Sequence, residues 1–198
     1  MPDKPLIVGI GGTIGAVSST ERALRIALDA VEREGFATRL FGGEDMARLP
    51  LYDPRAASRT SQEREFVDAV RKASGVIIAS PGYHGSLSGV VKNALDLLEE
   101  TAKDARPYLA DMPVGLIATA YGWQATGTTL ATLRSIVHAL RGWPTPLGAA
   151  INSSGGIFKG GICTDEGAAR QLDLVGRQVY EFARLRLANP DVTDTGEA

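Results

Sequence analysis

The stretch Gly75-Val-Ile-Ile-Ala-Ser-Pro-Gly-Tyr-His-Gly-Ser-Leu-Ser-Gly-Val-Val-Lys-Asn-Ala-Leu-Asp-Leu-Leu98 decides the fold. Its first part, Val76 to Ala79, is a short apolar run that ends at a chain-breaking residue, which is typical of a strand buried on both faces. Its last part, Val90 to Leu98, has the apolar spacing of an amphipathic helix, and Ser88 is placed to cap it. The sequence therefore predicts a strand, a loop and a helix, which together make half of a βαβ unit.

The predicted loop, Ser80 to Gly89, offers backbone and aromatic rings, and it contains neither a carboxylate pair nor a set of metal ligands. Gly82 and Gly85 let the main chain approach a flat ligand closely, because glycine has no Cβ. Tyr83 and His84 add an aromatic face and a polar tip. On this loop alone, a tight turn with surface aromatics and a ligand site are equally good interpretations.

The rest of the chain continues the same alternation. Four further strands are predicted at residues 6–10, 38–41, 113–120 and 147–151, and four further helices at residues 20–33, 61–73, 129–140 and 165–187. Right-handed crossovers between these elements predict an α/β doubly wound sandwich, with a five-stranded parallel sheet of order 2-1-3-4-5. Ligands bind such sheets in the crevice at the carboxyl ends of strands 1 and 3.

The loop that follows the first strand, Gly11 to Thr20, is the second candidate for a ligand site. Ser18, Ser19 or Thr20 is predicted to cap the next helix, and a helix N-terminus with nearby hydroxyls favours a phosphate. The loop is neither a Walker A sequence nor a glycine turn with dinucleotide spacing. Ordinary helix capping is the alternative interpretation of these three hydroxyls.

Three other connections need an interpretation. Residues 119–128, after the strand at 113–120, form a second loop rich in glycine and aromatic residues. Residues 42–61 are a long connection, for which we expect a pocket wall, a subunit contact or a plain surface loop. Residues 152–161 are rich in glycine and are a candidate lid.

The 198 residues, 44% hydrophobic and 22% charged, have the composition of a globular protein. We expect one domain over residues 1–188 and a disordered polar tail over residues 189–198. The net charge of −2 argues against binding to nucleic acid or to an anionic membrane surface. The single Cys163 excludes an internal disulfide, and no segment is apolar enough for a membrane span or a signal peptide, so we expect a cytoplasmic protein.

The run Ser80-Pro-Gly-Tyr-His-Gly-Ser-Leu-Ser-Gly-Val-Val-Lys-Asn-Ala-Leu-Asp96 resembles the signature loop of the NADPH-dependent FMN reductases. In that family the loop reads Ser-Pro-x-Tyr-x-x-Ser-x-x-Gly-x-x-Lys-Asn-x-x-Asp, and the fold is flavodoxin-like. The family's first loop, Gly-Ser-x-Arg-x-x-Ser, binds the FMN phosphate and is matched here by Gly12-Thr13 and Ser18-Ser19. Gly15 stands in place of the arginine, which predicts weaker retention of FMN.

The resemblance implies a set of FMN-binding residues on three loops. They are Gly12, Thr13, Ser18, Ser19 and Thr20 on the first loop, Pro81, Gly82, Tyr83, His84, Gly85 and Ser86 on the signature loop, and Thr119, Ala120, Tyr121 and Gly122 on the third. The implied reaction is hydride transfer from NADPH or NADH to the N5 atom of FMN. Because the cofactor carries this chemistry, no catalytic acid or base is expected, and the backbone of residues 82–86 would tune the flavin.

The same resemblance implies partners and supporting residues. Reduced FMN would pass to a partner monooxygenase or another acceptor, and the protein would form a homodimer or homotetramer. Candidate interface residues are Val90, Leu97, Trp123 and Leu130. Asn93 is interpreted as a support for the signature loop, and Arg55 and Arg59 as candidates for reading the 2′-phosphate of NADPH. Trp123 has a second interpretation, stacking on flavin or nicotinamide.

Three other functions remain open at this point. The first is a reductase of quinones or azo compounds that holds its FMN tightly. The second is a flavodoxin-like electron carrier without NAD(P)H activity, although such carriers are usually more acidic than this chain. The third is a nucleotide-binding or regulatory α/β domain without flavin.

Overall fold

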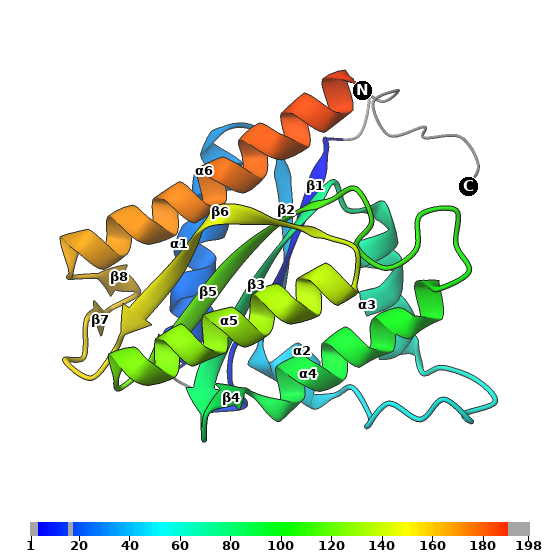
Figure 1. Ribbon diagram of the computed structural model, residues 1–198, viewed down its shortest axis with the longest axis horizontal. Helices are drawn as coiled ribbons and strands as arrows, with labels where there is room; N and C mark the ends of the chain where they lie inside the picture. Colours follow the sequence, from blue (N-terminus) through cyan, green and yellow to red (C-terminus); the bar gives the residue numbers. More distant parts are fainter. Residues whose placement is uncertain (1–3, 16–17, 190–198) are drawn as a thin grey trace.

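The computed structural model of the chain describes residues 4–15 and 18–189, and a parallel sheet runs through its middle (Figure 1). The sheet order is β2-β1-β3-β5-β6, with β4 paired to β3 outside this path. The main strands are β1 (Leu6–Gly11), β2 (Ala37–Phe41), β3 (Gly75–Tyr83), β5 (Pro113–Ala120) and β6 (Trp143–Asn152). All four neighbouring pairs of main strands are parallel, so the predicted doubly wound order 2-1-3-4-5 is confirmed.

Helices cover both faces of the sheet and make a three-layer sandwich (Figure 1). One face packs against α1 (Ser19–Arg33) and α6 (Glu166–Ala188). The other packs against α3 (Ser61–Lys72), α4 (Gly89–Asp96), the 3-10 turn η1 (Leu97–Thr101) and α5 (Trp123–Ala139), with the short α2 (Gly43–Ala47) beside them.

The continuous apolar runs of the strands follow from these two layers. In β3, Val76 and Ile78 lie in the core with α3, α4 and α5, whereas Ile77 and Ala79 lie in the core with α1 and α6. Successive side chains of a strand point to opposite faces, so a strand covered on both faces needs apolar residues at every position.

The predicted loop at residues 80–89 is in fact a β-hairpin. Strand β3 continues to Tyr83, and Ser86–Leu87 form the antiparallel strand β4, which pairs with residues 82 and 83. His84 and Gly85 both have positive φ, at 48° and 90°, which a two-residue hairpin turn of type I′ requires. Ser88 lies at the N-cap of α4, but its side chain makes no capping bond, which corrects that prediction.

Helix α5 begins at Trp123, six residues before the predicted start at 129. Residues 123–128 look like a loop in the sequence because they contain threonines and Gly127. In the structure, Thr126 and Thr128 donate their hydroxyls to carbonyls of the preceding turn, so these side chains are satisfied within a helix. The expected loop at 119–128 is therefore only the short link 121–122.

The segment predicted as a lid, residues 152–161, contains β7 (Phe158–Lys159), which pairs with β8 (Ile162–Cys163) directly after the segment to form a small hairpin. Arg22 of α1 donates to the carbonyl of Phe158 at 3.1 Å, which fixes the hairpin beside the start of that helix. The predicted tail lies outside the described residues, apart from Asn189.

Strand β6 is the last strand of the sheet order and carries two prolines, Pro144 and Pro146. The backbone N–H of Leu147 donates to the side-chain oxygen of Gln178 on α6 at 3.0 Å, rather than to a strand. Among the described residues, no helix is long and apolar enough to cross a membrane, and no group of three or more His, Cys, Asp or Glu residues could hold a metal ion.

Candidate functional site

A cavity of about 410 Å³ lies at the carboxyl ends of β1, β3 and β5. Three connections form its walls: the loop between β1 and α1, the hairpin after β3 and the link between β5 and α5. This is the crevice expected from the topology of the sheet. Its lining residues are Thr13, Ser18, Ser19, Thr20, Pro81, Gly82, Tyr83, Thr119, Ala120, Tyr121, Gly122, Ala125 and Ser153.

The first wall is folded around the hydroxyl of Ser18. This hydroxyl oxygen accepts the backbone N–H of Glu21 at 3.1 Å, which caps α1, and the backbone N–H of Thr13 at 3.2 Å. No described residue accepts the hydrogen of the Ser18 hydroxyl, so this hydroxyl can donate to a ligand. The hydroxyls of Thr20 and Thr119 share a buried hydrogen bond of 2.5 Å, which ties this wall to the end of β5.

The second wall is the hairpin, and Ser80 organises its base. The buried Ser80 hydroxyl donates to the carbonyl of Pro81 and accepts the backbone N–H of Ser88, at 2.9 Å each. Gly82 lies directly against α5: a Cβ at this position would be 2.8 Å from the Thr129 hydroxyl and 3.0 Å from the Ala125 carbonyl. Helix α5 can therefore approach the hairpin backbone only because residue 82 is glycine.

The third wall is held to the strand beside it. The backbone N–H of Ser153, just after β6, donates to the carbonyl of Ala120 at 2.8 Å. Gly122 lines the cavity, and a Cβ added there would meet no atom of the described residues within 4 Å, so the space beside its backbone is open. Tyr121 next to it is 83% exposed, and a flat ligand could lie against bare main chain at this point.

The structure brings most of the predicted FMN-binding residues to this cavity. Eleven of the fifteen line it: Thr13, Ser18, Ser19, Thr20, Pro81, Gly82, Tyr83, Thr119, Ala120, Tyr121 and Gly122. Gly12, His84, Gly85 and Ser86 do not, because Gly12 packs beside Glu21 and the hairpin turn carries the other three residues away from the cavity.

The sequence did not point to two of the lining residues, Ala125 and Ser153. Ser153 had a usable signal, since Asn152, Ser153 and Ser154 are polar residues directly after a buried strand. Ala125 had no such signal, because the sequence around it predicts a loop and not the first turn of a helix. Trp123, which was expected to stack on a ligand or lie in an interface, is 65% exposed and is not among the lining residues.

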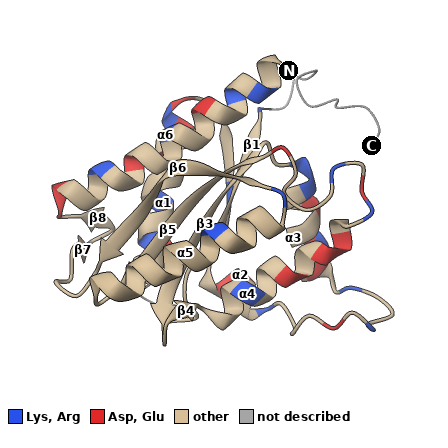
Figure 2. Cartoon of the chain, in the orientation of Figure 1, with Lys and Arg blue, Asp and Glu red and all other residues tan. Residues whose placement is uncertain are grey.

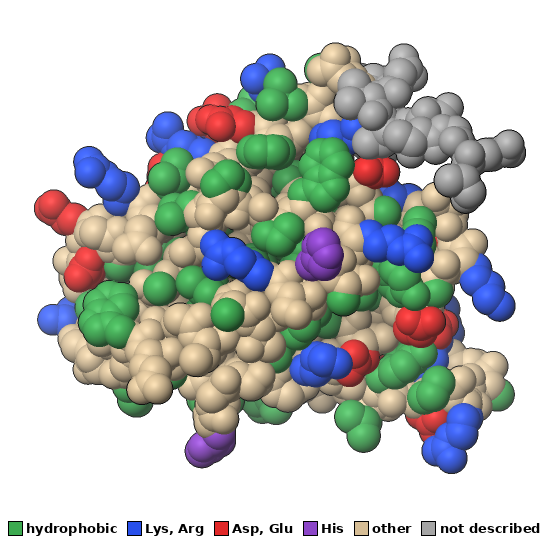
Figure 3. All heavy atoms as spheres, viewed as in Figure 1, with side chains coloured by type: hydrophobic (Ala, Val, Ile, Leu, Met, Phe, Trp, Pro, Cys, Tyr) green, Lys and Arg blue, Asp and Glu red, His purple; other side chains and the backbone are tan. Residues whose placement is uncertain are grey.

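The cavity is electrically neutral in its side chains. No Lys, Arg, Asp, Glu or His is among the described residues that line it. Figure 2 shows the ribbon of β4 and of the first half of α5 without charged positions, whereas acidic residues gather at α4 and beyond it. Figure 3 has the same orientation as Figure 1. In this space-filling view, charged side chains are also sparse at the lower left, where Figure 1 shows β4 and the start of α5.

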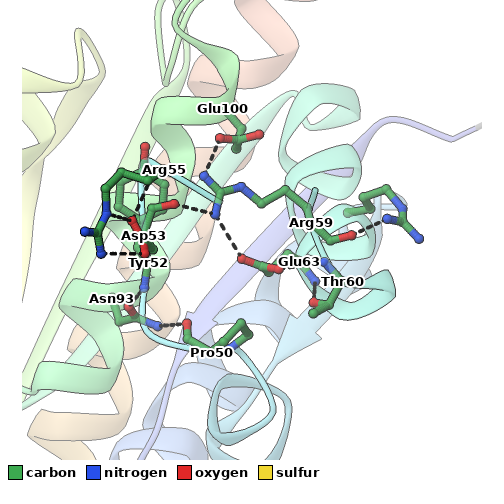
Figure 4. Close-up of polar contacts among 10 residues, drawn as sticks. Pro50, Tyr52, Asp53, Arg55, Arg59, Thr60, Glu63, Asn93 and Glu100 are labelled. Atoms are coloured by element: carbon green, nitrogen blue, oxygen red, sulfur yellow. Dashed lines mark hydrogen bonds and ion pairs between the residues drawn. The ribbon is translucent and has the colours of Figure 1, made fainter. Parts of the chain in front are cut away.

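The long connection after β2 does not line the cavity, but it packs beside α4 (Figure 4). Asn93 of α4 accepts the backbone N–H of Tyr52 at 2.8 Å and donates to the carbonyl of Pro50 at 2.9 Å. Asn93 therefore clamps the long connection on both sides of Leu51, rather than the signature loop that it was predicted to support.

We call the group Tyr52, Asp53, Arg59, Glu63 and Glu100 the brace, because it fastens the same connection to α3 and η1 (Figure 4). The Arg59 guanidinium lies over the Tyr52 ring, 4.8 Å from its centroid, and donates to the carbonyl of Asp53 and to both glutamates. The side chains of Arg59 and Glu63 are only 11% and 3% exposed, so this is a largely buried ion pair.

Two residues of the brace, Tyr52 and Asp53, have shifted pKa values. Burial raises the pKa of Tyr52 above its ordinary value, although the charge of Arg59 opposes this. Hydrogen bonds from Arg55 lower the pKa of Asp53. Arg55 and Arg59, the candidates for reading a 2′-phosphate, are thus both already paired with acidic groups.

The cavity suits a flat, phosphorylated aromatic ligand such as FMN. Bare backbone at Gly82 and Gly122 can lie against a ring, and the hydroxyls of Thr13, Ser18 and Ser19, with the N-terminus of α1, can accept a phosphate. The described lining residues include no Asp, Glu, His, Lys or Arg, so the hydride chemistry would have to come from the bound group.

Comparison with known proteins agrees with this geometry. Residues 5–156 match the family described as NADPH-dependent FMN reductase. An FMN-dependent NADPH-azoreductase of Staphylococcus saprophyticus is 34% identical over 122 residues, which cover 58% of this chain and 60% of the relative. The match to the corresponding protein of Staphylococcus haemolyticus is 35% identical and covers only 45% of it, so the chain spans roughly half the length of these relatives.

Two further similarities extend over most of the chain. The NADH:(hydroxy)cinnamate reductase subunit CrdA of Vibrio ruber is 26% identical over 183 residues, which cover 90% of this chain and 87% of that protein. The flavoenzyme FerB of Paracoccus denitrificans, an NAD(P)H:(acceptor) oxidoreductase, superposes with a TM-score of 0.76 at 18% identity over 91% of this chain and 98% of its own. The second similarity shows the fold alone.

Proposed function

The chain belongs to the NADPH-dependent FMN reductase family, and we propose that it catalyses the reduction of FMN by a nicotinamide dinucleotide. The observation that carries this proposal is the neutral cavity at the carboxyl ends of β1, β3 and β5, walled by hydroxyls on one side and by bare backbone on the others. That donor set fits a phosphate at one end and a flat ring at the other.

Each wall has a separate task in this proposal. Thr13, Ser18 and Ser19 bind the phosphate, while the hairpin and the link after β5 hold the ring in one orientation and keep water from its edge. Backbone N–H groups near Gly82 stabilise the negative charge that the ring gains on reduction. When bound, the flavin supplies the hydride acceptor, so the protein needs no catalytic acid or base of its own.

FMN acts as an exchangeable substrate in this proposal, with either NADPH or NADH as the donor. Exchange is favoured because Gly15 leaves the first loop without a cation that could hold the phosphate. Reduced FMN would then pass to another acceptor, such as a partner monooxygenase. The exposed Trp123 and the half-buried Val90 are candidate contacts of a homodimer or homotetramer in the cytoplasm. The other two residues predicted for an interface, Leu97 and Leu130, are buried in the core beside the sheet, which corrects that prediction.

A second function is favoured by the aromatic side chains at the mouth of the cavity. Tyr83 and Tyr121 line the cavity and are 52% and 83% exposed, so they offer rings to a flat acceptor. Two relatives are FMN-dependent NADPH-azoreductases. In this alternative the protein keeps its FMN and reduces a quinone or an azo compound.

Calorimetric titration with FMN, combined with NADPH and NADH oxidation at rising FMN, tests both functions. Turnover that saturates with added FMN supports the exchangeable substrate. A protein that is yellow when isolated, with turnover independent of added FMN, supports the second function. Absence of flavin binding overturns both.

Two glycine variants connect this test to the cavity. In Gly122→Val the new side chain enters the open space beside the backbone, so we expect flavin binding to be lost. Gly127→Ala is the matched control, because a Cβ at this position in α5 also meets no atom within 4 Å, but the residue does not line the cavity. Equal flavin binding by the two variants would place the site elsewhere.

A further inference from the structure

The loop at the phosphate end of the cavity contains no cationic residue. Residues 11–20 include neither Lys nor Arg, and every described residue that lines the cavity is uncharged. A phosphate monoester carries a charge of about −1.5 to −2 at neutral pH. The first ionic side chains after this loop are Glu21 and Arg22, in the first turn of α1.

Glu21 is fixed directly behind the wall of the cavity. Its Oε2 atom accepts the backbone N–H of Gly43 at 2.9 Å, at the start of α2. A Cβ at Gly12 would lie 3.0 Å from the same oxygen, and a Cβ at Gly42 would lie 2.6 Å from it. The carboxylate is thus enclosed by glycine backbone, one residue from the lining residue Thr13.

Among the residues that the structure describes, the charged side chains around this carboxylate are bonded to other groups. Arg22 donates to the carbonyl of Phe158 at 3.1 Å, which directs its guanidinium toward the β7–β8 hairpin. Asp45 adds a second carboxylate on the side of α2, where it accepts the backbone N–H of Gly42 at 3.0 Å. Arg39 lies 3.8 Å from Asp45 but is nearer to Glu65, at 2.9 Å.

We propose that Glu21 determines phosphate selectivity, and that its fixed negative charge makes the flavin site accept riboflavin nearly as well as FMN. The N-terminus of α1 and the neutral hydroxyls attract a phosphate, whereas the half-buried carboxylate behind Gly12 repels it. The two effects largely cancel. This inference rests on the proposed function, because it concerns the same site.

The first test compares the dissociation constants of FMN and riboflavin, measured by quenching of flavin fluorescence at low and high salt. For the unaltered protein the two constants should agree within about tenfold. In Glu21→Gln the amide oxygen still accepts the Gly43 N–H, so the loop keeps its shape while the charge is removed. We expect FMN to bind about tenfold more tightly to this variant, with riboflavin binding unchanged.

A second test adds a charge rather than removing one. Gly15 has room for a side chain, since among the described residues a Cβ there would meet only the Thr13 hydroxyl, at 3.6 Å. Gly15→Arg should strengthen FMN binding about tenfold, and the gain should shrink as salt rises. Gly15→Gln is the matched neutral control and should leave the ratio of FMN to riboflavin affinity unchanged.

The outcomes separate this inference from the proposed function. A strong preference of the unaltered protein for FMN, with no selective gain in Glu21→Gln, overturns the inference but leaves a flavin site. If Arg22→Gln weakens FMN alone, then Arg22 supplies the phosphate charge and Glu21 does not set the balance. If Glu21→Gln does not fold, two measurements still test the inference. They are the ratio of the FMN and riboflavin dissociation constants of the unaltered protein, and the comparison of Gly15→Arg with Gly15→Gln. Failure to bind either flavin overturns the proposed function itself.

Discussion

The cavity and the brace lie on the same molecule and are held together by opposite kinds of interaction. The cavity walls are joined by hydroxyls and backbone, as in the pair Thr20–Thr119 and in the two bonds of Ser80. The brace is joined by charges, with Arg59 between Glu63 and Glu100. Ionic groups are thus absent from the described cavity walls and instead fasten a connection that does not line the cavity.

We expect the largest effect from a substitution that disrupts the packing of the hairpin against α5, in the wall of the cavity. In Gly82→Val the side chain would collide with the Thr129 hydroxyl and the Ala125 carbonyl, and it would push α5 away from the hairpin. We expect FMN reduction to fall about 100-fold, because a displacement of the wall misplaces the ring. Steady-state kinetics and flavin titration measure this effect.

A second glycine, Gly89 at the start of α4, provides the control for this prediction. A Cβ at Gly89 meets no atom within 4 Å, so Gly89→Ala should retain the activity. If Gly82→Val is as active as Gly89→Ala, the hairpin and α5 do not fix the site.

The next largest effect concerns stability and belongs to the brace. Arg59→Met leaves the buried Glu63 carboxylate without its cation, which should lower the free energy of unfolding by about 3 kcal/mol. Flavin affinity should change little, because the brace does not line the cavity. Urea unfolding and flavin titration of the same sample check both statements.

A double variant shows whether the loss comes from an unpaired charge. Arg59→Met combined with Glu63→Gln should recover part of the stability, because no carboxylate then remains buried alone. A double variant as unstable as the sum of the single variants contradicts this reason. A large loss of flavin affinity in Arg59→Met would show that the brace also contributes to flavin binding in the cavity.

A smaller effect is expected for the hydrogen bond between Thr20 and Thr119 in the cavity walls. Thr20→Val and Thr119→Val each remove one partner of the buried hydroxyl pair, and a double-mutant cycle should give a coupling of about 1 kcal/mol. This coupling should not change between low and high salt, because neither group is charged. A coupling that disappears in high salt would show that charges also hold the cavity together.

The smallest effect is a pH dependence in the brace. Burial raises the pKa of Tyr52 above its unfolded value of about 10.0, so its contribution to stability is fully present below that pH and is lost as pH rises through the folded pKa. Tyr52→Phe should therefore soften the alkaline decline of the melting temperature and leave the acid side unchanged. An identical alkaline decline in both proteins would rule out Tyr52 as its source.

The order of the sheet and most of the cavity walls could be predicted from the sequence, because strands buried on both faces leave continuous apolar runs. Residues 113–120 show this well, since the predicted strand and the observed β5 coincide. The crevice between strands 1 and 3 then followed from the topology, and with it the placement of Thr13, Ser18 and Tyr83.

Other features had no local signal that could reveal them. The turn at His84-Gly85 lacks the usual Asn-Gly, and the first turns of α5 are rich in threonine, so both were read as loop. The capping role expected of the Ser88 side chain is absent, and its backbone N–H is bonded to Ser80 instead. The positions of Glu21 and Arg59 depend on residues distant in the sequence, which no single stretch can specify.

The two prolines of β6 have a consequence for the behaviour of the protein at high concentration. An outermost strand with free N–H groups can recruit strands from other molecules and begin an aggregate. Pro144 and Pro146 have no N–H to offer, and the N–H of Leu147 is already bonded to Gln178. That border of the sheet is therefore a poor template for fibril growth, and replacing both prolines by valine should make the protein prone to aggregate without altering its cavity.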